Sequence, residues 1–213
     1  MHTLDFHFVE AGIVGLLDDP AWETALPVTV ETLWSGDAAG YGRSFDVAAL
    51  WSDEELYIRF DCRQTEPLVI AEQPVTEIKS PQLWERDVCE AFIACDKSEP
   101  RKYLEFEVAP TGEWLDLAVD ATSGSFVKDW KYDTGLRVDA RIDGDRVLMA
   151  MAIPFRAFGK RPEQGEVWLG NFYRCVGKGP DRGMLAWSPT MTERPRFHVP
   201  AAFGEFHFVN RNS

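Results

Sequence analysis

Apolar and polar residues alternate with a period of two along much of the chain, and helical spacing is not sustained over three turns. Such alternation places successive side chains on opposite faces of a strand that has one buried face. The N-terminal residues 1–8 begin the pattern. The further segments that we expect to form strands are residues 55–61, 87–93, 103–109, 113–120, 136–142, 146–153 and 167–176.

Turn-forming residues separate these segments. Asp143-Gly144 between two alternating runs is a strong hairpin signal. Residues 154–159 are expected to form one helical turn that ends at Gly159, among at most two or three such turns. Many strands without crossover helices predict an antiparallel β-sandwich with layers of the immunoglobulin-like or jelly-roll type. Because no repeat or linker divides the sequence, residues 1–213 are expected to form a single domain.

Composition narrows the function. A formal net charge of −13 repels phosphate backbones, and no run of Lys and Arg forms a basic patch, so nucleic acid is not an expected partner. The longest apolar run, residues 11–17, is too short to span a membrane, and a soluble protein is expected. Gly177-Lys178-Gly179 is too short for a phosphate loop, so neither a nucleotide nor a flavin is predicted.

The cysteines at positions 62, 89, 95 and 175 form no CxxC pair and have no zinc-like spacing with the histidines. We expect buried thiols, with one disulfide as the alternative if a signal peptide preceded the sequence. Residues 1–8 alternate like a strand and do not resemble a signal peptide. A native start at Met1 would therefore predict a cytoplasmic protein, and a removed signal peptide would predict an extracellular or periplasmic one.

The segment from Trp84 to Ile93 is the most informative part of the sequence. Alternation places Glu90 on the same strand face as Val88 and Phe92, and Asp87 on the opposite face. A carboxylate among apolar neighbours is costly to bury unless it is hydrogen-bonded or faces a ligand cavity. Glu90 is therefore a candidate for binding sugar hydroxyls, and a salt-bridged glutamate at a sheet edge is the alternative.

Two tryptophans lie in polar, loop-like surroundings. Trp84 precedes the strand that carries Glu90, and Trp187 is followed by Ser188-Pro189-Thr190. Flat aromatic rings cover the apolar faces of sugars, so both are candidates for sugar contact. Most of the eight tryptophans are expected in the core, and Trp114 and Trp130 stay undecided.

The chain resembles carbohydrate-binding module family 9 through nearly its whole length. The resemblance rests on the order and spacing of residues 84–92, 103–112, 152–155, 171–174 and 197–206. It implies a β-sandwich that holds a sugar between two tryptophans, Trp84 and Trp187, with Glu90 as the sugar-contacting glutamate. It also implies a mono- or oligosaccharide ligand and an association with a glycoside hydrolase.

Two features of this family find no clear counterpart in the sequence. Glu105 and Glu107 occupy the strand on which the family carries a basic residue, and Arg174 could supply that charge instead, with a structural salt bridge as the alternative. The resemblance also implies structural calcium. The sequence does not assign its ligands, although four acidic residues lie near loops: Asp116, Asp120, Asp133 and Asp181.

Two other classes of function stay open. A glycoside hydrolase would need Glu90 and a second carboxylate on either side of the scissile bond, for which the candidates are Asp87, Glu105 and Glu107. A haem-binding sandwich would need axial ligands such as Met184 or Met191 with His198. Binding without catalysis is the principal expectation.

Overall fold

The fold is known from a computed structural model that describes residues 2–210. Strands and short 3-10 turns are its regular elements. The strands are β1 (Thr3–Phe8), β2 (Val28–Val30), β3 (Phe45–Trp51), β4 (Glu55–Arg63), β5 (Val88–Ala94), β6 (Lys102–Val108), β7 (Trp114–Asp120), β8 (Val127–Asp129), β9 (Arg137–Asp143), β10 (Arg146–Pro154), β11 (Val167–Val176), β12 (Gly183–Ala186) and β13 (Gly204–Val209). The 3-10 turns are η1 (Pro20–Thr24), η2 (Leu83–Glu85), η3 (Phe155–Phe158), η4 (Gly179–Asp181) and η5 (Pro200–Ala202).

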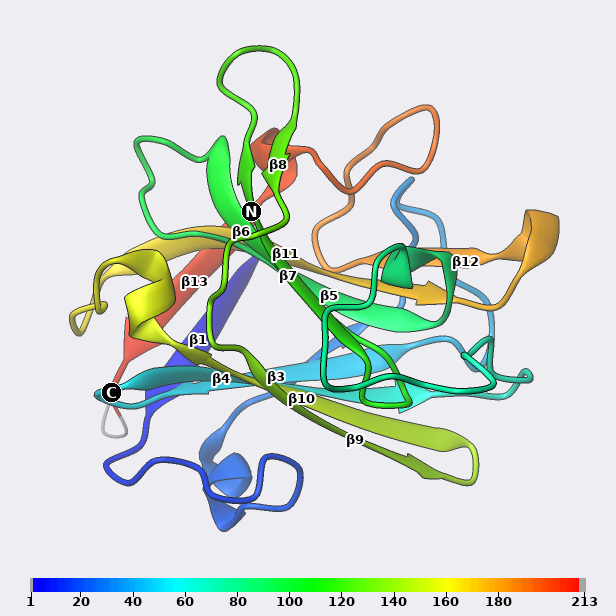
Figure 1. Cartoon of the computed structure of the whole chain (residues 1–213), viewed down its shortest axis with the longest axis horizontal. Coiled ribbons are helices and arrows are strands. Elements are labelled where there is room, and N and C mark those ends of the chain that lie inside the picture. Colours follow the sequence, from blue (N-terminus) through cyan, green and yellow to red (C-terminus); the bar gives the residue numbers. More distant parts are fainter. Residues whose placement is uncertain (1, 211–213) are drawn as a thin grey trace.

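The strands form one continuous sheet that curls into two facing layers (Figure 1). Its order is β8-β7-β6-β5-β11-β13-β1-β3-β4-β10-β9, with β12 paired to β11 and β2 paired to β3. Most pairs are antiparallel, but β1 is parallel to both β13 and β3. The N-terminal strand therefore joins the two layers, and the sandwich is mixed at this point.

Three apolar clusters stabilise the layers. The largest lies between them and includes Phe60, Phe106 and Phe172. A second cluster covers the outer face of the layer formed by β5, β6, β7 and β11, where loop residues such as Trp84 and Phe197 pack on it. A third lies under the segment that follows β1, on the outer face of β3, β4 and β10. Both faces of each layer are thus covered in part, which explains why many strands are buried on both sides.

The expected all-β sandwich is confirmed, and each of the predicted strands is present within one or two residues at its ends. The hairpin at Asp143-Gly144 joins β9 to β10, and η3 ends at Phe158 with Gly159, whose φ is 67°, as its C-cap. The described residues contain five 3-10 turns, more than the two or three expected. The additional turns lie mainly in loops, where sequence alternation gives no information.

Buried thiols are confirmed for Cys62, Cys89 and Cys175, whereas Cys95 is only partly buried. The Sγ atoms of Cys62 and Cys89 are 3.5 Å apart between the layers, so the alternative of one disulfide would fall on this pair.

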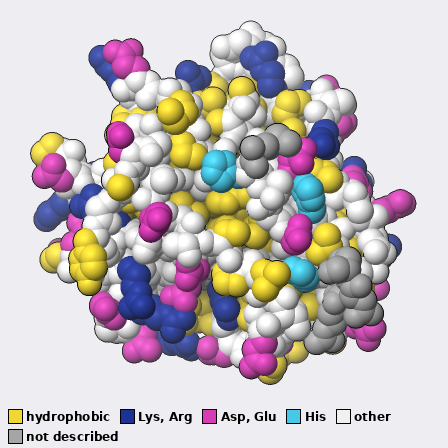
Figure 2. Space-filling view, turned by 180° about the vertical axis from the view of Figure 1, so that it is seen from behind, with side chains coloured by type: hydrophobic (Ala, Val, Ile, Leu, Met, Phe, Trp, Pro, Cys, Tyr) yellow, Lys and Arg dark blue, Asp and Glu magenta, His cyan; other side chains and the backbone are white. Residues whose placement is uncertain are grey.

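No helix within residues 2–210 is long and apolar enough to cross a membrane. Figure 2 shows one face of the molecule, on which basic side chains lie among acidic ones.

Candidate functional site

A cavity of about 420 Å³ opens over the second apolar cluster, on the outer face of β5, β6 and β11. Its walls combine aromatic rings with charged groups. The lining residues are Trp84, Glu90, Phe92, Glu105, Phe126, Lys128, Cys175, Arg182, Met184, Pro195, Arg196, Phe197 and His198. Such a mixture of apolar surface with a few convergent polar groups is typical of small-ligand sites.

Trp84 reaches this cavity from the turn η2, just before β5. The buried neighbour Leu83 anchors the turn, and Gln82 before it has a φ of 59°. Arg182 fixes the other side, because its Nη2 donates to the carbonyl oxygens of Trp84 and Arg86. The indole ring is only partly buried against the apolar cluster, so one part of it borders the cavity.

Glu90 lies on the floor of the cavity. As alternation predicts, it shares the outer face of β5 with Val88 and Phe92, and it is only 2% exposed. Asp87 lies on the opposite side and accepts hydrogen bonds from the backbone N–H groups of Val69 and Gly177. Asp87 therefore does not pair with Glu90 across the cavity as the two carboxylates of a glycosidase would.

Two further glutamates on β6 join Glu90. Glu107 is its direct partner across the β5–β6 pair, and Glu105 lies two residues earlier on the same face. Burial and the neighbouring Glu105 raise the pKa of Glu90 to about 8. Burial raises the pKa of Glu105 as well, and burial with Glu90 and Glu105 raises that of Glu107 well above its usual range. Protonation of Glu90 is consequently favoured at neutral pH in the absence of another cation.

Lys128 is the nearest ammonium group. Its Nζ lies 3.3 Å from Glu105 Oε2 and 5.4 Å from the centroid of the Trp84 ring, within the range of a cation–π interaction. The exposed Trp130 ring is tilted against Trp84, with 6.0 Å between the centroids. Lys128 is also 5.9 Å from the centre of Trp130, so the lysine and both rings form one unit beside the cavity.

His198 forms another part of the cavity wall. Its Nδ1 is hydrogen-bonded to the hydroxyl of Tyr103 at 2.7 Å, and its ring stacks on Phe92. Burial, and then the charges of Lys128 and Arg196, lower the pKa of His198 to about 3. The imidazole is therefore neutral at neutral pH, and it presents a flat polar ring to the cavity.

The structure does not bring Trp187 to the cavity. Its side chain is buried in the cluster between the layers, with ring centroids 5.7 Å from Phe172 and 5.6 Å from Phe206. The ring fills the space above Gly204, where a Cβ atom would lie 2.4 Å from it. A ring enclosed in this way presents no free face to a ligand, so the expected pair of stacking tryptophans is not assembled.

Arg174 also lies away from the cavity. On β11, Tyr173 and Cys175 face the cavity side, whereas Arg174 points the other way. Its Nη1 donates to the backbone carbonyls of Arg43 and Arg63, and its Nη2 donates to Gln64 Oε1. The guanidinium is thus a structural donor to buried carbonyl groups and does not replace the basic residue expected at the site.

The other sequence candidates are dispersed. Asp116 is fully buried and neutralised by Lys79, with Thr134 donating to its second oxygen, so it does not fit a calcium ion. Asp120 accepts hydrogen bonds from Thr122 in its own loop. Met184 and His198 both line the cavity, while Met191 is 71% exposed and does not line it.

Comparison with known proteins decides the family. The profile of carbohydrate-binding family 9 matches residues 25–208, most of the chain. The chain belongs to carbohydrate-binding family 9. A protein of Arthroderma benhamiae named "Extracellular protein" is 28% identical over 141 residues, which cover 60% of this chain and 63% of the relative. The alignment thus spans less than two thirds of that relative's length.

Solved structures share the family 9 fold. A Bacteroides uniformis protein proposed to bind carbohydrate has a TM-score of 0.75 at 20% identity, covering 97% of this chain and 98% of its own. A family 9 module of Caldicellulosiruptor kristjanssonii in complex with glucose has a TM-score of 0.71 at 12% identity and covers 100% and 98%. The same organism's module in complex with cellotriose has a TM-score of 0.70 at 13% identity and covers 100% and 96%.

Sequence reasoning missed the basic groups of this cavity. Lys128 lies on the short edge strand β8, and Arg182 lies in the loop between β11 and β12. Neither segment has a pattern that would place it beside Trp84. The sequence does indicate that Glu105 lies on the cavity side of β6, because Glu105 alternates in phase with Tyr103 and Glu107.

Proposed function

We propose that the cavity binds the terminal ring of a mono- or oligosaccharide, without catalysis. The observation that carries this proposal is the placement of a partly exposed tryptophan, Trp84, at the rim of a family 9 cavity that has Glu90 on its floor. The indole face would cover the apolar C–H groups of a sugar ring. Glu90 and His198 would exchange hydrogen bonds with its hydroxyl groups.

A longer sugar has room beside the first ring. A second cavity of about 460 Å³ shares Phe126, Arg196 and His198 with the first. Arg196 lies over the ring of Phe126, with its guanidinium carbon 5.1 Å from the ring centroid. The bound glucose and cellotriose of the Caldicellulosiruptor kristjanssonii modules make β-linked glucose units the first ligands to test.

The proposed setting is the outside of the cell, in association with a glycoside hydrolase. The relative named "Extracellular protein" supports the location. The association with a hydrolase rests on the family resemblance. A binding role fits the acidic cluster better than hydrolysis, because the carboxylates that line the cavity, Glu90 and Glu105, lie together on neighbouring strands and not on opposite sides.

Calorimetric titration tests this function. Wild-type protein is expected to bind glucose, cellobiose or cellotriose with a dissociation constant roughly in the micromolar to millimolar range, because the aromatic contact is small. Comparison with reduced cellotriose would report whether the reducing end is recognised. Trp84→Ala is expected to weaken binding about tenfold or more, since the ring that covers the sugar is lost.

Tyr41→Ala is the matched control, because Tyr41 is an aromatic residue that is 96% exposed and does not line the cavity. This variant should bind like the wild type. Folded wild-type protein that binds none of the sugars, or equal affinity in the Trp84 and Tyr41 variants, would contradict the proposed function at this site.

A further inference from the structure

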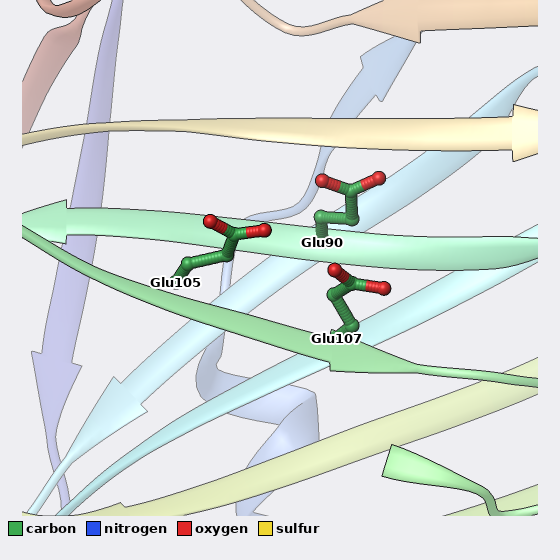
Figure 3. A group of neighbouring side chains, drawn as sticks. All are labelled: Glu90, Glu105 and Glu107. Atoms are coloured by element: carbon green, nitrogen blue, oxygen red, sulfur yellow. The ribbon is translucent and has the colours of Figure 1, made fainter. Parts of the chain in front are cut away.

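The three glutamates on the cavity floor form a cluster that the contact with a sugar does not account for. Glu90, Glu105 and Glu107 each offer a carboxylate oxygen, and these oxygens all lie within 4.8 Å of one another. Figure 3 shows the three side chains gathered over β5 and β6. Glu107 is completely buried and Glu90 and Glu105 are each 2% exposed, so water compensates little of their charge.

The buried carboxylate of Glu107 lacks a hydrogen-bond partner among the described residues. Among the described residues, neither of its carboxylate oxygens has a hydrogen-bond partner, although the side chain is fully buried. It also lies directly opposite Glu90 in the antiparallel pair, where like charges are destabilising. Buried polar groups are nearly always paired, and an unpaired one calls for an explanation such as an ion.

The surrounding cations do not meet this need. Lys128 is within ion-pair distance of Glu105. Arg182 commits its Nη2 to the backbone oxygens of Trp84 and Arg86, although its charge favours the ionised form of Glu90. Neither cation forms an ion pair with Glu107 among the described residues. Ionisation of all three carboxyl groups would therefore leave negative charge that a further cation could balance.

We propose that Glu90, Glu105 and Glu107 bind one hard divalent cation, such as Ca²⁺, on the floor of the cavity. Calcium–oxygen distances are about 2.3–2.6 Å, so two ligands on opposite sides of the ion lie about 4.6–5.2 Å apart. The observed spread of the carboxylate oxygens, within 4.8 Å, allows one ion to contact all three side chains. An all-oxygen carboxylate set favours Ca²⁺, Mg²⁺ or Mn²⁺ over softer metals.

Three side chains provide at most six oxygens, whereas Ca²⁺ takes six to eight. Because Glu90 and Glu105 line the cavity, the remaining positions of the ion would face it. Water would fill these positions in the sugar-free, ion-bound protein. The cation site shares Glu90 with the proposed sugar site, but Glu105 and Glu107 on β6 serve the ion alone, so ion binding is measured without sugar.

The test begins with chelator-treated, sugar-free protein and calorimetric titration with Ca²⁺ and with Mn²⁺. The wild type is expected to bind one ion per chain and to unfold at a higher temperature in its presence. Glu107→Gln replaces an ionised carboxylate ligand with a neutral amide of similar shape, and it should weaken ion binding roughly tenfold or more. Glu163→Gln, on an exposed loop, is the matched control and should bind like the wild type.

A second measurement uses the wild type alone and does not depend on the folding of a variant. Paramagnetic Mn²⁺ in the cluster should broaden the indole N–H signal of Trp84, which borders the same cavity, much more strongly than that of Trp22, which is buried in the apolar cluster on the outer face of β3, β4 and β10. No binding of Ca²⁺ or Mn²⁺ to folded wild-type protein would overturn the proposal and indicate that the glutamates share protons. Unchanged ion affinity in folded Glu107→Gln would also overturn it. Sugar binding is measured separately, so either proposal can fail alone.

Discussion

Replacing Trp187 with alanine is expected to lower the free energy of unfolding by about 3–5 kcal/mol, the usual cost of removing a large buried aromatic side chain. The ring packs on Phe172 and Phe206 between the layers and closes the space above Gly204. Its removal would leave a cavity in the main core. Denaturant unfolding of the variant and of the wild type measures this difference.

Tyr41→Ala again serves as the control for the Trp187 prediction, because surface substitutions usually change stability by less than about 0.5 kcal/mol. Sugar affinity measured on the folded fraction of Trp187→Ala should be similar to that of the wild type. A stable Trp187→Ala protein that no longer binds sugar would instead indicate that Trp187 contacts the sugar.

The free energy of unfolding of metal-free wild-type protein is expected to fall as pH rises from about 4.5 to 8. The pKa of Glu90 rises from 4.5 to about 8 in the folded state, chiefly through burial. Between these values the folded chain holds a proton that the unfolded chain has released, so raising the pH favours unfolding. A shift of one pKa unit corresponds to about 1.4 kcal/mol, and the expected loss exceeds that amount.

Glu90→Gln isolates this effect, because the amide does not titrate and does not repel Glu105 or Glu107. Denaturant unfolding in the presence of a chelator, repeated across the pH range, should give a flatter curve for this variant than for the wild type, and Glu105 and Glu107 should account for part of the slope that remains. Glu163→Gln should reproduce the wild-type curve. Identical slopes in the wild type and in Glu90→Gln would show that Glu90 does not carry the pH dependence.

The strands with one covered face were predictable from the sequence, because alternation marks them directly. The strand β3 was not predicted, since its pattern of burial is nearly continuous and alternation disappears when both faces are covered. The short strands β2, β8 and β12 carry too few residues to show any period. The parallel position of β1 between β13 and β3 depends on pairing between the ends of the chain, which no local pattern reports.

The candidate site was predictable only in part. The phase of alternation placed Glu90 and Asp87 on the correct opposite faces of β5. The sequence suggests an exposed Trp187 because its neighbours are polar and include a proline. The ring instead points inward and fills the space that Gly204 leaves. For Arg174 the sequence does not indicate which face of β11 borders the cavity. Tertiary pairing decides that question.

The central claim is that a sugar contacts Trp84 over the Glu90 floor, and the indole N–H signals of the tryptophans test it most directly. Trp84→Ala assigns one of these signals, and cellotriose is then titrated into ¹⁵N-labelled wild-type protein. The account predicts that saturating sugar shifts the Trp84 signal strongly and leaves those of the buried Trp187 and Trp22 nearly unchanged. Sugar binding that shifts Trp187 and not Trp84 would contradict it.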